Sequence, residues 1–163
     1  MNHPLPWVVS GFFAKPSWQS DLAAFGRRNN MRPREFMRNE PHILIADDNA
    51  DIRELAQAIL QAAGFRVSTT DTTAGALQLA KTERFDALLL DYWMPELTGI
   101  ELCRHIRRFD QSTPILICSG AVTEPDREAA TLAGAQGYLN KPFNSHELIR
   151  ALRACLKPSK ITT

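Results

Sequence analysis

The chain has 163 residues, which suits one domain of ordinary size with a modest extension and leaves no room for a second large domain. Its formal net charge of +1 argues against bulk electrostatic attraction to nucleic acid. No apolar run approaches the roughly 18 residues that a membrane-spanning helix needs. We therefore expect a soluble, cytoplasmic protein with no membrane partner and no direct nucleic-acid partner.

The first 40 residues differ in character from the rest of the chain. They hold six lysines or arginines against three acidic residues, a net charge of +3, and they lack regular periodicity. We expect residues 1–40 to form a basic N-terminal extension, residues 41–157 to form the domain, and residues 158–163 to form a C-terminal tail. Three interpretations stay open for the extension: a disordered tail, a docking segment or short helix at residues 21–25, and a later natural start at Met31 or Met37.

Short apolar or β-branched runs alternate with segments of helical periodicity after His42. The expected strands are residues 43–46, 65–69, 87–90, 115–118 and 137–139. Because right-handed crossovers are strongly preferred, this alternation predicts an α/β fold, a doubly wound five-stranded parallel sheet with helices on both faces.

Each expected strand is followed by apolar residues at helical spacing. The residues at helical spacing are Ile52, Leu55, Ile59 and Leu60; Ala76, Leu77 and Ala80; and Ile100, Cys103, Ile106 and Arg107. Residues 126–133 predict a weaker, Ala-rich helix, and the last helix is expected to bury Leu148, Ala151, Leu152 and Cys155. Thr72 can cap the second helix, and Asn144 can cap the last helix while Glu147 answers from the third position. The odd cysteine count, with no metal-binding spacing, favours buried free thiols at Cys103, Cys118 and Cys155.

Polar side chains stand where four of the five strands end. Asp47 and Asp48 follow the first strand, Asp91 the third, Ser119 the fourth and Lys141 the fifth. Ligands bind beyond the carboxyl ends of parallel strands, so these groups are expected to share one site. Three neighbouring carboxylates repel and either take up a proton or share a cation. Hard oxygen ligands favour Mg²⁺, with Mn²⁺ possible.

Four blocks around these positions resemble the receiver domain of two-component response regulators. They read ILIADDNADIRELAQAIL, FDALLLDYWMPELTG, TPILICSGA and GYLNKPFNSHELIRAL, and they stand in the family's order between His42 and about Lys157. The resemblance implies a flavodoxin-like fold with strand order 2-1-3-4-5, similar to CheY-like single-domain regulators. It also implies a phosphoprotein that works in signal transduction.

The family pattern assigns the metal ligands and the phosphoacceptor. By resemblance, Asp91 accepts a phosphoryl group, and Asp48 and Asp91 ligate Mg²⁺ together with the backbone carbonyl of Trp93. Asp47 acts mainly through water or by orientation. Trp93 and Ala121 are apolar where family members vary, and we hypothesise slow self-dephosphorylation because neither side chain can orient a water. A partner-binding surface is an equally open interpretation of Trp93.

The same pattern assigns the groups that act beside Asp91. Lys141 pairs with Asp91 before transfer and with a phosphoryl oxygen afterwards, and a cis peptide bond before Pro142 aims it at the pocket. Ser119 donates to another phosphoryl oxygen. Ser119 and Tyr138 match the family's switch positions: Tyr138 rotates into the space that Ser119 vacates and reshapes the face of the fourth helix, fifth strand and fifth helix. Static packing is the alternative for Tyr138.

These observations predict a stand-alone receiver domain rather than an enzyme, with autocatalytic phosphoacceptance and self-dephosphorylation as its only chemistry. The expected partners are a histidine kinase or histidine phosphotransfer protein and an output protein, with a phosphorylation-dependent homodimer possible. A phosphorelay intermediate, a phosphate sink and a phosphorylation-independent scaffold stay open. An aspartyl phosphatase needs an acid where Trp93 stands, and the acidic loop at Asp47 and Asp48 would repel a flavin phosphate.

Overall fold

The computed structural model describes residues 40–121 and 123–156. The expected tail at 158–163 and the extension, apart from Glu40, lie outside the described residues, so both stay predictions. Within the described part of the chain, no helix is both long and apolar enough to cross a membrane.

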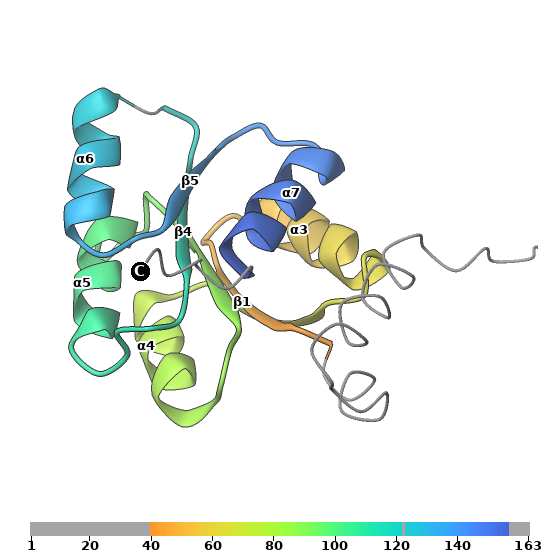
Figure 1. The fold of residues 1–163 in the computed structure, drawn as a ribbon, viewed down its shortest axis with the longest axis horizontal. Coiled ribbons are helices and arrows are strands. Elements are labelled where there is room, and N and C mark those ends of the chain that lie inside the picture. The colour runs from red at the N-terminus through yellow and green to blue at the C-terminus, as the bar shows by residue number, and fades with distance from the viewer. Residues whose placement is uncertain (1–39, 122, 157–163) are drawn as a thin grey trace, which may run out of the picture. The chain divides into compact units, whose positions relative to one another are not determined.

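Five parallel strands form one sheet, which runs through the middle of Figure 1. They are β1 (His42–Ala46), β2 (Arg66–Thr70), β3 (Ala87–Asp91), β4 (Ile115–Ser119) and β5 (Gly137–Asn140). Their order is β2-β1-β3-β4-β5, which confirms the predicted fold class and topology. Every residue of β1, β3 and β4 is buried, as expected for the inner strands of a parallel sheet covered on both faces.

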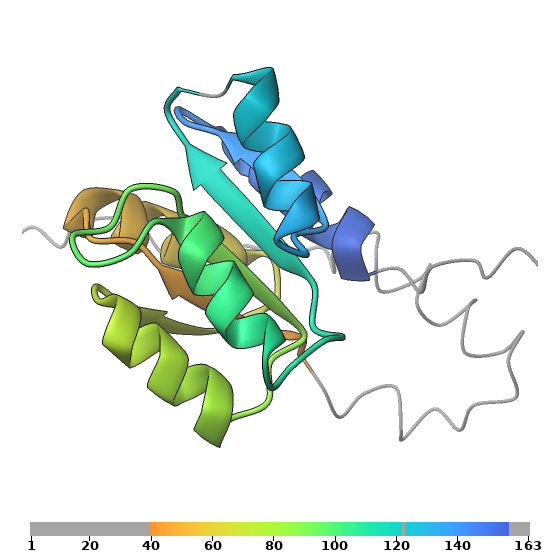
Figure 2. The ribbon, with the colours of Figure 1, turned by 90° about the vertical axis from the view of Figure 1, so that its left-hand side faces the viewer.

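Helices cover both faces of the sheet (Figures 1 and 2). They are α3 (Ala50–Ala62), α4 (Thr73–Thr82), α5 (Gly99–Arg107), α6 (Glu124–Leu132) and α7 (Ser145–Leu156). The predicted caps are present: Thr72 accepts from the Gly75 amide, and Asn144 and Glu147 bond reciprocally. α6 begins two residues earlier than predicted, because Thr123 and Asp126 form a capping box ahead of it.

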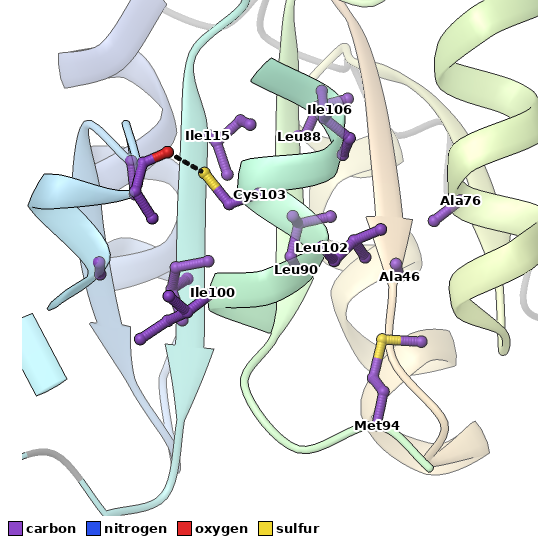
Figure 3. Packing of buried hydrophobic residues seen from close by; sticks show 14 of the residues in the cluster. Ala46, Ala76, Leu88, Leu90, Met94, Ile100, Leu102, Cys103, Ile106 and Ile115 are labelled. Carbon is purple, nitrogen blue, oxygen red and sulfur yellow. Dashed lines mark hydrogen bonds between the residues drawn. The ribbon is translucent and has the colours of Figure 1, made fainter. Parts of the chain in front are cut away.

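Two hydrophobic clusters fill the space between the sheet and its helices. One packs α4, α5 and α6 against the sheet, and Figure 3 shows part of it, including the Cys103 thiol that donates to the Ala133 carbonyl at 3.3 Å. The other packs α3 and α7 against the opposite face. All three cysteines are free; Cys103 and Cys118 are buried, and Cys155 is half-buried.

Leu55 shares the helical spacing of Ile59 and Leu60 but does not belong to the core. Its side chain is 49% exposed, and α3 buries Ala56 and Leu60 instead. Successive helical residues are about 100° apart, so a helix that presents Ala56 and Leu60 to the sheet turns Leu55 towards solvent. Helical spacing alone therefore identified the helix correctly but did not specify which of the spaced residues are buried.

Candidate functional site

The carboxyl ends of β1 and β3 bring three acidic side chains together. Asp47 and Asp48 directly follow β1, and Asp91 is the last residue of the neighbouring β3. One carboxylate oxygen from each of the three lies within 4.8 Å of the other two. Asp47 and Asp91 are 3% and 6% exposed, whereas Asp48 is open to solvent. The cluster thus has a buried floor and one accessible side.

Lys141 joins two of these carboxylates. Its Nζ donates to Asp47 Oδ2 at 2.6 Å and to Asp91 Oδ1 at 2.7 Å. The Lys141 amide also donates to the Ser119 carbonyl at 2.8 Å, which holds its backbone beside the end of β4. The Lys141-Pro142 peptide bond is cis, as the resemblance implied. The pairing with Asp91 was expected from the sequence, but the pairing with Asp47 was not.

The pKa values of this pair reflect its burial. Burial raises the pKa of Asp91, and the nearby Asp47 and Asp48 charges raise it further, although the hydrogen bond and charge of Lys141 act in the opposite sense. Burial by itself lowers the pKa of Lys141, but its bonds to Asp47 and Asp91 outweigh this, and the net shift is upward. One ammonium therefore does not compensate all the negative charge of the cluster.

Asp47 is held by contacts on both carboxylate oxygens. Its Oδ1 accepts from the Asn49 amide at 3.0 Å, while Oδ2 accepts from Lys141. Its backbone carbonyl accepts from Arg53 Nη1 at 2.7 Å, a contact that the sequence interpretation missed because no local pattern marks it. Among the described residues, none donates a hydrogen bond to the Asp48 carboxylate. This arrangement agrees with an orienting role for Asp47 and leaves Asp48 available to a cation.

The three carboxylates fit a small divalent cation. In an octahedral Mg²⁺ site with ligands at about 2.1 Å, neighbouring oxygens lie about 3 Å apart and opposite ones about 4 Å apart. The oxygens here lie within 4.8 Å of one another, so small side-chain movements would bring them to that spacing. All the side-chain metal ligands in the cluster would be hard carboxylate oxygens, which favour Mg²⁺ or Mn²⁺ over softer metals.

The loop between β3 and α5 returns closely past Asp91. The Gly99 amide donates to the Tyr92 carbonyl at 2.8 Å, and a Cβ on Gly99 would lie 2.3 Å from the Asp91 carbonyl oxygen. Only glycine fits there, and this lets α5 begin beside the end of β3. Trp93, within this loop, is 66% exposed. The role of its carbonyl as a metal ligand stays a prediction.

Ser119 and Tyr138 lie on adjacent strands, β4 and β5. Ser119 is 1% exposed, and its hydroxyl donates to the Ala121 carbonyl at 3.0 Å. The Tyr138 hydroxyl is buried and finds no hydrogen-bond partner among the described residues. Burial raises the pKa of Tyr138; Ser119 is close enough to oppose this shift but bonds to Ala121 rather than to the phenol. Arg127 lies 5.7 Å above the Tyr138 ring. The switching role of both residues stays a prediction.

A family model described as the response regulator receiver domain matches residues 43–153. The chain belongs to this family. Its receiver domain is 37% identical over 119 residues to the response regulator MprA of Mycobacterium ulcerans, covering 73% of this chain and 51% of that protein. MprA of Mycobacterium avium is 37% identical over 118 residues, covering 72% and 52%. The chain thus spans about half the length of these curated relatives.

Solved receiver structures share the fold. The chemotaxis protein CheY4 of Vibrio cholerae superposes with a TM-score of 0.68 at 32% identity, covering 72% of this chain and 100% of that chain. The receiver domain of the sensor histidine kinase PA1611 from Pseudomonas aeruginosa has a TM-score of 0.68 at 31% identity, covering 74% and 100%, and its structure has magnesium coordinated in the active-site cleft. The acidic cluster of this receiver domain is therefore of the kind at which receivers bind Mg²⁺.

Proposed function

We propose that this receiver domain accepts a phosphoryl group on Asp91 from the phosphohistidine of a histidine kinase or histidine phosphotransfer protein. The observation that carries the proposal is the arrangement at the strand ends. Asp91 is a buried carboxylate in contact with the Lys141 ammonium and surrounded by two further carboxylates. A cation and a lysine beside one buried carboxylate are what a phosphoryl acceptor needs to offset charge.

Transfer itself requires little of the protein beyond orientation and charge compensation. An Asp91 carboxylate oxygen attacks phosphorus, the phosphorus–nitrogen bond to the donor imidazole breaks, and the imidazole leaves with that electron pair. Lys141, already 2.7 Å from Asp91, moves to a phosphoryl oxygen, and the Ser119 hydroxyl donates to another. A bound Mg²⁺ would be held by Asp48 and Asp91 and would offset the negative charge of the carboxylates and the phosphoryl group. Asp47 keeps Lys141 in place.

The signal is proposed to travel through Ser119 and Tyr138. For Ser119 to reach a phosphoryl oxygen, its hydroxyl must give up its bond to the Ala121 carbonyl. The buried Tyr138 hydroxyl has no partner among the described residues, so reorientation of this side chain would relieve the cost of an unpaired hydroxyl. The surface of α6, β5 and α7 changes with it and offers a phosphorylation-dependent site for an output protein or a second copy of the chain.

We also propose that the domain is cytoplasmic, acts alone and has no catalytic activity beyond accepting and losing its own phosphate. The chain covers CheY4 completely, whereas the MprA relatives are matched over about half their length. A phosphorelay intermediate and a phosphate sink use the same Asp91 chemistry. The intact carboxylate cluster and its lysine favour all three over a scaffold that never takes up phosphate.

The decisive experiment is phosphorylation by a small donor. The protein is incubated with acetyl phosphate and Mg²⁺, and intact mass is measured. We expect one added phosphoryl group on the unmodified protein, none on Asp91→Asn, and a normal adduct on Asp71→Asn, a matched control at an exposed aspartate outside the cluster. Excess EDTA should suppress the adduct. A protein that remains unmodified with acetyl phosphate and Mg²⁺ would overturn the proposal.

A further inference from the structure

The loop at residues 92–98, here called the acceptor loop, is anchored at several points around Trp93. Its two ends are tied by the bond from the Gly99 amide to the Tyr92 carbonyl. Met94 is 7% exposed and belongs to the hydrophobic cluster; Figure 3 shows it at the carboxyl end of the strands with Ala46. The Trp93 side chain itself points out to solvent at 66% exposure. The backbone of Trp93 is therefore placed by its neighbours.

The far side of the acceptor loop is held by a different helix. The Thr73 hydroxyl, on the first residue of α4, donates to Glu96 Oε2 at 2.6 Å. Thr73 is 2% exposed, whereas Glu96 is an exposed residue of the loop. A buried hydroxyl needs a partner, and here the partner is a carboxylate from a segment 23 residues away in sequence. Neither residue belongs to the acidic cluster.

Several features make this bond stronger than an ordinary surface contact. Its donor–acceptor distance is in the short range of hydroxyl–carboxylate bonds, which are roughly twice as strong as neutral ones. The Glu96 carboxylate also lies at the amino end of α4, where the helix dipole favours a negative charge. Thr72 caps the same helix end separately through the Gly75 amide, so the Thr73 hydroxyl is not needed as the cap.

We propose that Thr73 is a positioning residue for phosphoryl acceptance. By holding Glu96, it fixes the acceptor loop against α4 and sets the Trp93 backbone relative to Asp48 and Asp91, so that the site binds its divalent cation without first ordering the loop. This inference rests on the proposed function. Loss of the Thr73 hydroxyl leaves the acidic cluster intact but adds the cost of ordering the loop to each cation-binding event.

The test compares Thr73→Val, which has the same shape without the hydroxyl, with Thr73→Ser, which restores it. Mg²⁺ is titrated while backbone amide chemical shifts around Asp48 and Trp93 are followed by NMR in the full chain. We expect the half-saturating Mg²⁺ concentration to rise about three- to tenfold in Thr73→Val, the range for the net contribution of one ordinary hydrogen bond, and to return to within about twofold in Thr73→Ser. The matched control is Thr82→Val, whose hydroxyl bonds within α4 at its other end.

Glu96→Gln provides a second route, because an exposed residue of a loop can be changed with little risk to folding. It keeps an acceptor for Thr73 but removes the charge, and we expect a rise of about twofold in half-saturating Mg²⁺. Phosphorylation by acetyl phosphate at saturating Mg²⁺ should proceed normally in Thr82→Val, whose hydroxyl takes no part in holding the loop. A role limited to stability would lower the unfolding midpoint of Thr73→Val with unchanged Mg²⁺ affinity, and that result overturns the inference.

The two proposals fail in different ways. If the unmodified protein binds Mg²⁺ but takes up no phosphoryl group, the proposed function fails. If the unmodified protein is phosphorylated and Thr73→Val matches it in Mg²⁺ affinity, only the role of Thr73 is wrong. Equal weakening in Thr73→Val and Thr73→Ser would also overturn the inference, because the hydroxyl would then not be the cause.

Discussion

Removal of the Lys141 ammonium is expected to destabilise the metal-free fold strongly. Asp47 and Asp91 have side chains only 4% and 8% exposed, and Lys141 bridges them at 2.6 and 2.7 Å. No other lysine or arginine of the described residues forms an ion pair with either carboxylate. Lys141→Met keeps most of the side-chain volume but leaves two buried negative charges facing each other.

The magnitude follows from charge separation and burial. At an effective dielectric of about 20, each contact of Lys141 is worth about 6 kcal/mol of attraction, and two carboxylate oxygens within 4.8 Å repel by at least about 3 kcal/mol. Desolvation of the ammonium cancels part of the attraction. Loss of one partner from a buried pair costs about 3–5 kcal/mol in other proteins. Because the Lys141 side chain is partly exposed, we expect its removal to lower the free energy of unfolding by about 3 kcal/mol.

Urea unfolding followed by circular dichroism at pH 7, with EDTA or with saturating Mg²⁺, measures this effect. Mg²⁺ should stabilise Lys141→Met more than the unmodified protein, because the cation then replaces the missing positive charge. Lys81→Met, at an exposed lysine that lies over the Phe109 ring, should change the unfolding free energy by less than about 1 kcal/mol. Equal stability of Lys141→Met and the unmodified protein in EDTA would refute the reasoning.

Three further substitutions probe the same site. Burial and nearby carboxylates raise the pKa of Asp91 above its usual value of 3.8. Protonation of Asp91 therefore stabilises the folded state; this stabilisation is fully present below pH 3.8 and is lost as the pH rises through the folded-state pKa. Asp91→Asn should therefore be more stable than the unmodified protein in EDTA at pH 7, with an advantage that shrinks towards pH 4 in urea unfolding. Tyr138→Phe removes a buried hydroxyl without a partner among the described residues and should leave the unfolding free energy unchanged or raise it by up to about 1 kcal/mol; a clear loss in urea unfolding would contradict this. Trp93→Asn should shorten the lifetime of the phosphorylated protein, followed by intact mass after donor removal, because an amide can orient a water where the exposed indole cannot; an unchanged lifetime would argue against water shielding.

The amino-acid pattern alone predicts the fold class and which residues can meet. Alternating strand and helix patterns require parallel strands, and parallel strands place all their carboxyl ends at one edge. The residues that follow or end strands were therefore predictable neighbours; they are Asp47, Asp48, Asp91 and Lys141. Four consecutive family-like blocks pointed to the same site, and a family model now covers residues 43–153.

The contacts that those side chains share depend on how the helices and strands pack together. Lys141 reaches Asp47 across 94 positions of sequence as well as Asp91, and Arg53 holds the Asp47 carbonyl from α3. Thr73 meets Glu96 because α4 packs beside the β3–α5 loop, although neither residue stands out in the sequence. Periodicity specifies the type of an element and roughly its buried face. It does not specify the rotation of each helix on the sheet, and that rotation selects which polar side chains come within hydrogen-bond distance.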